Sequence, residues 1–155
     1  MKEIEDKALT NFKQNNSGTT DLKDEIVKCL LKWYKSDVMT WFNEPNCTNC
    51  NNKTNYFDTL PPTFMEDLFS AKRTEVYQCE KCLKLIRFPR YYNPAKISQI
   101  KTGRCSEYAN LFGSILRALD YDVRFVDNYE DHVWNEYWSE FHQRVIFINK
   151  NSGFM

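Results

Sequence analysis

A chain of 155 residues, 42% of them apolar, is long enough for one domain with a core of its own. Its 21 basic residues balance 21 acidic ones, so the composition gives no support to nucleic-acid binding or to attraction by a membrane surface. No run approaches the roughly 20 apolar residues that span a bilayer, and the charged first 14 residues lack the apolar region of a signal peptide. We therefore expect a cytoplasmic protein whose six cysteines do not form structural disulfides.

The N-terminal part of the chain predicts a polar segment followed by an amphipathic helix. Residues 1–20 are polar and end in a cluster of Asn, Ser and Gly, so we expect a flexible segment, with a short helix at best and then a linker. Apolar residues recur at helical spacing over residues 22–38, and Thr20 or Asp21 can cap the start. Cys29 falls inside this helix and is expected to be a buried thiol.

The middle of the chain reads as an irregular segment between helices. Residues 43–62 are rich in Asn and Pro and predict no regular element. Residues 63–66 (TFME) form a capping-box pattern that opens a short helix. Gly103 breaks the chain, and apolar residues then share one helical face from Cys105 to Leu119.

The period of the pattern changes to two in the last third of the chain. Residues 121–127, 133–138 and 144–149 predict three strands. Helices followed by a meander of strands predict an α+β fold. We expect a single domain over residues 21–155, preceded by the N-terminal segment 1–20.

Two CxxC pairs stand in the middle of the chain, Cys47 with Cys50 and Cys79 with Cys82. Two residues between cysteines let both sulfurs reach one ion, and four thiolates complete a tetrahedral zinc site. Two separate redox motifs, or buried thiols, are the alternatives, but matched pairs in an intracellular chain favour zinc. A site closed by four sulfurs predicts a structural Zn²⁺, in a lobe at about residues 43–86.

Cys105 stands apart from these four and begins a predicted helix. The helix dipole and the free N–H groups at a helix start stabilise a thiolate, which is the form a nucleophilic cysteine needs. An ordinary cysteine at a helix start is the alternative. The sequence around Cys105 therefore makes it a candidate nucleophile.

The last two predicted strands supply partners for such a nucleophile. If they form a hairpin with a four-residue loop, Trp138 pairs with Gln143 and His132 lies directly opposite Asn149. A helix-start cysteine with His and Asn side by side on a sheet has the nucleophile, base and orienting group of cysteine amidases and proteases. His142 falls in the loop, where we expect no catalytic role.

Several motifs together resemble those of the cytosolic peptide:N-glycanases. In order along the chain they are WF at 41–42 with the first CxxC pair, VYQCEKC at 76–82, RFPRY at 87–91, TGRCSEYAN at 102–110, LRAL at 116–119 and DHVWNE at 131–136. Papain-type proteases lack the zinc pair, and generic transglutaminases lack the RFPRY segment. The resemblance covers about residues 22–149. It implies a transglutaminase-like, cysteine-protease-like core of helix plus antiparallel sheet with a zinc-binding lobe, and an active site in a cleft between that lobe and the sheet.

The resemblance also implies an activity, that of a peptide-N4-(N-acetyl-beta-glucosaminyl)asparagine amidase. Such a hydrolase removes N-glycans from misfolded glycoproteins through a thioester on Cys105, with His132 as acid and base. The family's third catalytic residue is an aspartate, and Asn149 stands at that spacing here. The Asn149 side chain can still orient the imidazole but supplies no charge.

The same motifs imply substrate-binding residues, for which core packing or a solvated carboxylate is the alternative. Trp134 and Glu136 fall in the motif expected to meet the chitobiose core, and Trp41 in the segment expected to close the cleft opposite Cys105. The expected partners are misfolded N-glycoproteins.

Two rival functions stay open. A weak or inactive homologue could bind glycoproteins or proteasome-shuttle ubiquitin-like proteins as an adaptor. Asn149, and the chain's end at Met155 where family members continue, favour this rival. Acyl transfer to amines fits the Cys–His pair but not the zinc pair or the RFPRY segment.

Overall fold

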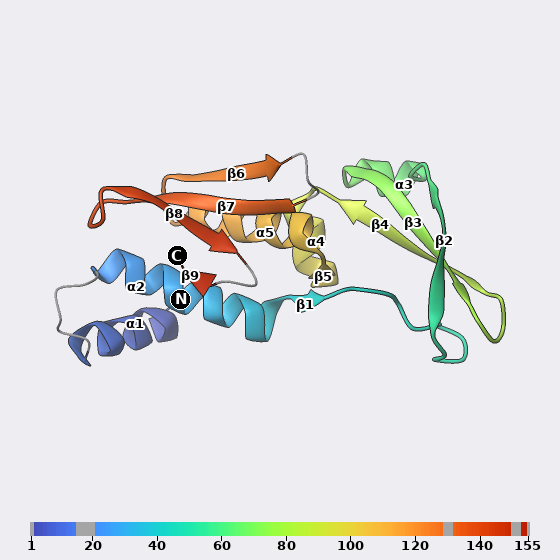
Figure 1. Ribbon diagram of the computed structural model, residues 1–155, viewed down its shortest axis with the longest axis horizontal. Coiled ribbons are helices and arrows are strands. Elements are labelled where there is room, and N and C mark those ends of the chain that lie inside the picture. Colours follow the sequence, from blue (N-terminus) through green and yellow to red (C-terminus); the bar gives the residue numbers. More distant parts are fainter. Residues whose placement is uncertain (1, 15–20, 129–131, 150–152, 155) are drawn as a thin grey trace. The chain divides into compact units, whose positions relative to one another are not determined.

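The computed structural model describes residues 2–14, 21–128, 132–149 and 153–154 (Figure 1). It divides into two compact units, one made of residues 1–39 and 108–155 and the other of residues 40–107. The predicted division into a segment 1–20 and a domain 21–155 stays a prediction. Within the described residues, no helix is both long and apolar enough to cross a bilayer.

The first unit begins with two helices, α1 (Lys2–Gln14) and α2 (Leu22–Trp33). Helix α1 is longer than the short helix expected, and its residues Ile4 and Ala8 are buried. The cap of α2 is Asp21, as one reading of the sequence predicted, because its side chain accepts the Asp24 N–H at 2.8 Å. The predicted helix ends as an α-helix at Trp33 and continues as a π-helical turn, η1 (Tyr34–Val38). The predicted linker at 15–18 lies outside the described residues.

The remainder of the first unit is a helix and a four-stranded antiparallel sheet. Helix α5 (Cys105–Ala118) begins in the second unit and runs into the first. The strands follow in the order β6 (Val123–Asn128), β7 (His132–Ser139), β8 (Arg144–Asn149) and β9 (Gly153–Phe154). The helix and the three strands predicted here are confirmed, with bounds that differ by at most two residues.

Tyr34 is the central side chain of the first unit's core. Its ring lies 5.6 Å from that of Tyr108 and 4.9 Å from that of Phe112. Its hydroxyl donates to the Tyr108 carbonyl at 3.0 Å, and the Tyr108 hydroxyl donates to the Met39 carbonyl at 2.6 Å. The two tyrosines therefore join η1 to α5 through hydrogen-bonded rings, and no hydroxyl of the pair is buried without a partner.

A buried carboxylate joins α2 to the hairpin of β7 and β8. Asp24 accepts from the Tyr137 hydroxyl at 2.6 Å and from the Ser139 hydroxyl at 2.8 Å. The His142 Nε2 lies 3.6 Å from the same carboxylate. Burial, followed by the hydrogen bond to Asp24, raises the pKa of Tyr137. Asp24 therefore fixes the turn end of the hairpin against the helix.

The predicted register of this hairpin is wrong by two residues. Trp138 pairs with Val145, not Gln143, and Ser139 pairs with Arg144. Ser139 belongs to the strand because Asp24 holds its buried side chain, and Gln143 takes the left-handed position of the loop, with φ 50°. A shift of two residues leaves every side chain on its predicted face. Continued by one residue, the register places Asn149 opposite Trp134, so Asn149 does not lie directly opposite His132 as predicted.

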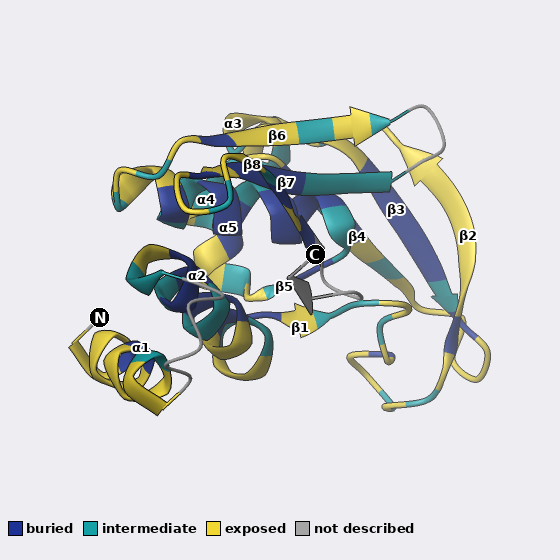
Figure 2. Ribbon diagram, turned by 60° about the vertical axis from the view of Figure 1, so that its left-hand side comes forward, coloured by how far each residue is buried: buried dark blue, intermediate teal, exposed yellow. Residues whose placement is uncertain are grey.

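The second unit contains a three-stranded antiparallel sheet and a short parallel pair. The sheet has the order β2 (Thr54–Leu60), β3 (Ala71–Cys79), β4 (Leu85–Tyr91), and the parallel pair is β1 (Thr40–Trp41) with β5 (Thr102–Gly103). Two short helices, α3 (Phe64–Leu68) and α4 (Pro94–Ile100), complete it. Strand β3 is mostly buried, whereas the edge strand β2 is almost wholly exposed (Figure 2).

Local signals explain part of this unit. The capping box predicted at 63–66 is confirmed, because the Thr63 N–H donates to Glu66 at 2.7 Å and the Glu66 N–H donates to the Thr63 hydroxyl at 3.3 Å. Pro89 lies in β4, an edge strand where a missing N–H is tolerated. The expectation of no regular element over 43–62 is wrong over Thr54–Leu60, because β2 forms by pairing with β3 and not by its own pattern.

We expect Asp24→Asn to destabilise the protein by about 1–3 kcal/mol, because an amide leaves one buried hydroxyl without an acceptor. The control is Asp127→Asn, an exposed position on β6 of the same unit, where the change should stay within about 0.5 kcal/mol. Urea unfolding of both variants measures the difference. Equal stabilities would show that the Asp24 network does not contribute.

Candidate active site and metal centre

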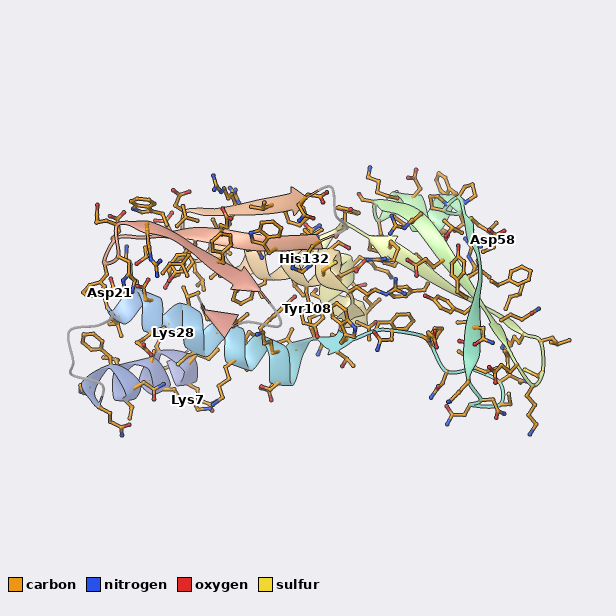
Figure 3. The ribbon with its side chains drawn as sticks, viewed as in Figure 1. Lys7, Asp21, Lys28, Asp58, Tyr108 and His132 are labelled. Carbon is orange, nitrogen blue, oxygen red and sulfur yellow. The ribbon has the colours of Figure 1, made fainter. Side chains whose placement is uncertain are left out.

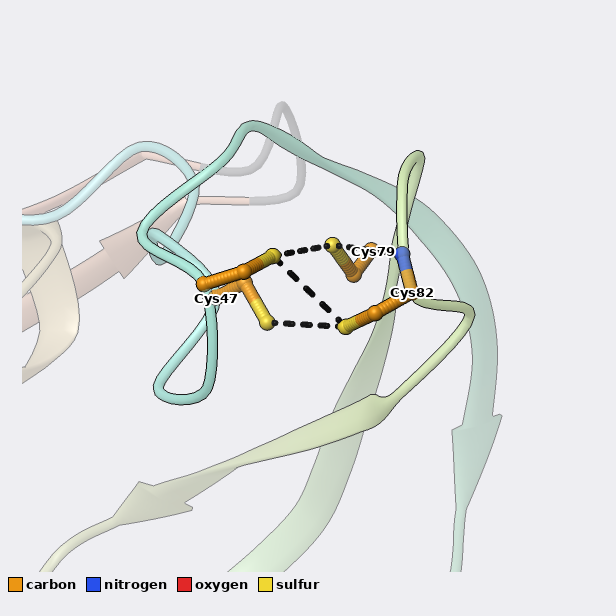
Figure 4. Close-up of side chains that lie close together, drawn as sticks. Cys47, Cys79 and Cys82 are labelled. Carbon is orange, nitrogen blue, oxygen red and sulfur yellow. Dashed lines mark hydrogen bonds between the residues drawn. The ribbon is translucent and has the colours of Figure 1, made fainter.

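The four predicted metal ligands come together in the second unit, and Figure 4 shows their side chains in close-up. The sulfurs of Cys47, Cys50, Cys79 and Cys82 all lie within 4.8 Å of one another. Three pairs are closer, with Cys47–Cys82 at 3.5 Å, Cys50–Cys79 at 3.4 Å and Cys50–Cys82 at 3.6 Å. Metal–sulfur bonds of about 2.3 Å in a tetrahedron separate the sulfurs by about 3.8 Å, so the cluster fits one ion.

Two turns of the same design supply these sulfurs. The Cys47 N–H donates to the Asn52 carbonyl and the Asn51 N–H donates back to the Cys47 carbonyl, each at 2.8 Å. The turn at Cys79 repeats both bonds with the residues at the same offsets, Lys84 and Leu83. Asn51 and Leu83 each have a left-handed backbone, with φ 53° and 59°. Each CxxC pair is therefore held by a closed loop of backbone hydrogen bonds.

Hydrogen bonds to Cys47 and Cys50, one thiol pair of the cluster, favour the ionised form of these two sulfurs. The Asn49 N–H donates to Cys47 at 3.4 Å and lowers the pKa of that thiol. The Asn52 side chain donates to Cys50 at 3.4 Å, and its hydrogen bonds lower the pKa of Cys50 to about 6. Thiolates are the metal-binding form of cysteine, so the turns prepare the cluster for a cation.

Cys105 is the first residue of α5, as the sequence predicted, and is half-buried. The residues on either side of it are firmly held. The Arg104 N–H donates to the Glu107 carboxylate at 2.9 Å, so a glutamate in the first turn caps the helix start. Gly103 is needed here, because a Cβ at this position would lie 2.3 Å from the Glu107 Cβ.

Trp41 lies beside the segment that leads into Cys105. Strand β1 pairs Trp41 with Gly103, and the Phe42 N–H donates to the Gly103 carbonyl at 3.0 Å. The Trp41 indole donates to the Asn43 side chain at 2.6 Å. The structure therefore brings Trp41 and Cys105 into neighbouring segments of one unit, while the predicted substrate-binding role of Trp41 stays a prediction.

His132 is the first residue of β7, in the other unit (Figure 3). Its N–H donates to the Asn128 side chain at 3.0 Å, and its ring stacks on that of Trp134 with centroids 5.6 Å apart. Phe147 of β8 lies 6.3 Å from the Trp134 ring. Residues two apart on a strand share a face, so His132 and Trp134 belong to an aromatic row on one face of the sheet.

Glu136 is the third predicted residue on this face, and it is buried between two donors. The Trp134 indole donates to it at 3.0 Å, and the Arg124 guanidinium donates to it at 2.6 Å. Glu136 therefore fixes the orientation of Trp134. Arg124 was missed from the sequence, although its place opposite Glu136 in the pairing of β6 with β7 is the kind of signal a strand register carries.

Two other residues were singled out in the sequence, Asn149 and Cys29. The side chain of Asn149 lies outside the described part of the chain, so its catalytic role stays a prediction. Cys29 was expected to be buried but is half-buried, and its sulfur accepts from the Asn11 side chain at 3.5 Å. Burial, followed by the charge of Glu25, raises the pKa of Cys29.

The model of the transglutaminase-like superfamily matches residues 62–152, which include both Cys105 and His132. The chain belongs to the transglutaminase-like superfamily. Similar curated proteins carry the name peptide-N(4)-(N-acetyl-beta-glucosaminyl)asparagine amidase. That of Saccharomyces cerevisiae is 39% identical over 136 residues, which are 85% of this chain and 38% of the relative. That of Caenorhabditis elegans is 45% identical over 126 residues, which are 80% of this chain and 21% of the relative. That of Arabidopsis thaliana is 35% identical over 154 residues, which are 97% of this chain and 21% of the relative.

This superfamily member thus spans about two fifths of the yeast relative and about one fifth of the worm and plant relatives. The matched family model confirms the transglutaminase-like fold class predicted from the sequence. The catalytic pairing of Cys105 with His132 stays a prediction.

We expect iodoacetamide at neutral pH to alkylate Cys105 at least roughly tenfold faster than Cys29, because the thiolate is the reactive form and a helix start favours it. Mass spectrometry of tryptic peptides, taken at intervals, measures both rates in the same sample. Equal rates, or faster labelling of Cys29, would contradict a nucleophilic role for Cys105.

Proposed function

We propose that this chain carries the catalytic core of a peptide:N-glycanase, a hydrolase that removes N-glycans from glycoproteins. The observation that supports this most is Cys105 at the first position of α5, in a chain whose relatives are named for this amidase activity. The chain covers only part of those relatives, so the activity of the whole protein is proposed for it. The aromatic row on the face of His132 is a second support, because flat rings suit stacking on sugars.

The proposed reaction has two steps. The Cys105 sulfur attacks the side-chain amide carbonyl of a glycosylated asparagine, and the C–N bond breaks as a thioester forms. His132 gives a proton to the departing glycosylamine. Water then loses a proton to His132 and attacks the thioester, which releases an aspartate side chain and returns Cys105 to its starting form.

The other predicted site residues would bind the substrate. Trp134, held by Glu136, presents a ring for stacking on the chitobiose core. Trp41 would contact the substrate near Cys105, since it pairs with Gly103 two residues away. Arg124 joins this set, because it binds Glu136 from the neighbouring strand.

We propose zinc as the metal of the four-cysteine cluster. The four thiolates, in matching turns and within 4.8 Å of one another, suit the tetrahedral coordination of a structural Zn²⁺. When bound, the ion would hold together the two turns that flank β2 and β3. With four protein ligands it would leave no position for substrate, so its role would be structural.

We further propose a setting for this activity. A chain with balanced charge and free cysteines suits the cytoplasm. Its substrates there would be misfolded N-glycoproteins exported from the endoplasmic reticulum for degradation. Ubiquitin-like proteins that shuttle substrates to the proteasome are the proposed partners for that disposal.

We expect the wild-type chain to release N-glycans slowly from a denatured high-mannose glycoprotein, and Cys105→Ala to release none. Asn149→Asp should raise the turnover number by at least roughly tenfold, because an aspartate stabilises the imidazolium that an asparagine only orients. Single-turnover glycan release measures all three proteins.

Two outcomes would contradict the proposed enzyme. If the wild type matches Cys105→Ala while Asn149→Asp releases glycan, the natural chain is an inactive binder. If none of the three releases glycan although all three bind the glycoprotein, the adaptor function replaces the hydrolase.

The zinc proposal predicts about one zinc per folded chain by elemental analysis. Chelation should unfold residues 40–107, since the binding energy of a structural metal is also folding energy. Cys82→Ser should lose the metal and melt lower, whereas Cys29→Ser, outside the cluster, should keep both properties. A metal-free wild type with an unchanged melting temperature would contradict the proposal.

A further inference from the structure

A buried glutamate lies two residues after Cys105 and binds an arginine from strand β4. Glu107 is 0% exposed and Arg90 of β4 is 6% exposed. The Arg90 Nε donates to one Glu107 oxygen at 2.7 Å and its Nη2 donates to the other at 3.0 Å. The same Nη2 donates to the Ser106 hydroxyl at 2.9 Å. One guanidinium thus holds the two residues that follow Cys105.

The residue that precedes Cys105 is held by the same charges. The Arg104 N–H donates to Glu107, and its guanidinium donates to Glu75 at 2.8 Å and to the Tyr77 hydroxyl at 2.5 Å. Arg90 also donates to Glu75, at 2.8 Å. Although burial opposes it, hydrogen bonds from Tyr77 and Arg90 hold the pKa of Glu75 below its ordinary value. Arg90 and Arg104 thus balance the two anions Glu75 and Glu107, and the more exposed Arg73 lies 3.9 Å from Glu75.

Stability alone gives no reason for this arrangement. A buried ion pair costs desolvation, and apolar residues of similar volume often stabilise a protein equally well or better. A bidentate pair adds a fixed orientation, because the N–H groups of a planar guanidinium donate to both carboxylate oxygens in one geometry. Here that geometry is applied to the first turn of α5, where the free N–H groups that stabilise a thiolate lie.

The second unit contains the same device at another helix, where no nucleophile is present. Glu66 of α3 accepts the Thr63 N–H at 2.7 Å, just as Glu107 accepts that of Arg104. Arg87 of β4 donates to both Glu66 oxygens, at 2.9 and 2.6 Å. This second pair is more exposed, with side-chain exposures of 35% and 12%. Strand β4 therefore holds two helix starts by matching arginine–glutamate pairs.

We propose that Arg90 and Glu107 are positioning residues for Cys105, which hold the first turn of α5 in the orientation that makes the thiol reactive. The proposal rests on the proposed function only in taking Cys105 as the nucleophile. Neither residue needs to touch the substrate, since both act through the backbone on either side of Cys105. The matching pair of Arg87 and Glu66 is predicted to have no such effect.

The test compares two double variants in the full chain, Arg90→Met/Glu107→Met and Arg87→Met/Glu66→Met. Each replaces one whole pair by apolar residues, so no member of the pair is left as an unpaired buried charge. Arg104 remains to balance Glu75 in the first variant. The measurement is the rate of iodoacetamide alkylation of Cys105, which trypsin isolates in the peptide 105–117. Circular dichroism and metal content confirm that each variant is folded.

We expect the first variant to alkylate Cys105 at least roughly tenfold more slowly than the wild type, and the second to react at the wild-type rate. In glycan release, the first variant should lose kcat with KM within about twofold. Wild-type alkylation in both variants, or equal slowing in both, would overturn the proposal. Slow alkylation of the wild type itself would instead count against Cys105 as the nucleophile, and so against the proposed function.

If the first double variant does not fold, Arg90→Lys and Arg87→Lys decide the question. Lysine keeps the positive charge but not the planar fork, so neither change leaves a buried carboxylate without a cation. Arg90→Lys should slow Cys105 alkylation by several-fold and Arg87→Lys should not. The same alkylation rate in both variants would overturn the proposal.

Discussion

The arrangement of the second unit depends on the buried carboxylate of Glu107. It accepts the N–H of Arg104, binds Arg90 through both oxygens and is reached by the Ser106 hydroxyl at 3.2 Å. An anion taken out of water must be fully paired, so each of these donors is needed where it is. The requirement for Gly103 follows from the same group, because the Glu107 side chain occupies the space that any Cβ at position 103 would take.

The metal centre is joined to this network by one strand. Cys79 is the last residue of β3, and Glu75 and Tyr77, which bind Arg104, lie four and two residues before it on the same strand. Strand β3 is central in its sheet and mostly buried, so it is paired on both edges. Strand β3 therefore connects the cysteine turns to the residues around Cys105.

The sheet of the first unit has one face that packs on the core and another that carries predicted functional residues. On one, Tyr137 and Ser139 are buried and bind Asp24 of α2. On the other, Trp134 and Glu136 bind each other next to His132. Alternation along β7 keeps these sets apart, so a change of register by one residue would exchange core and functional side chains. Asp24 sets the register of the hairpin at its turn end, and that register also fixes which side chains lie on the face of His132.

Local patterns in the sequence determined much of this protein. The helical period from Cys105 onward, the capping box at Thr63 and the alternation of β7 and β8 were readable because each depends on neighbours a few residues away. The two CxxC pairs were readable because two intervening residues bring the sulfurs of a pair together in any tight turn. The faces on which His132 and Trp134 lie followed from the period of two.

Only the tertiary structure decided features that join distant parts of the chain. Strand β2 exists by pairing with β3, and the hairpin register was missed by two residues because Asp24, more than 110 positions away in sequence, draws Ser139 into the strand. The pairing of Arg90 with Glu107 was equally invisible, since an arginine in a strand has no local signal for a carboxylate on a distant helix. A pattern along the chain records the period and the turns. Contacts between residues that only the fold brings together produce no pattern in the sequence, and these contacts hold the candidate site.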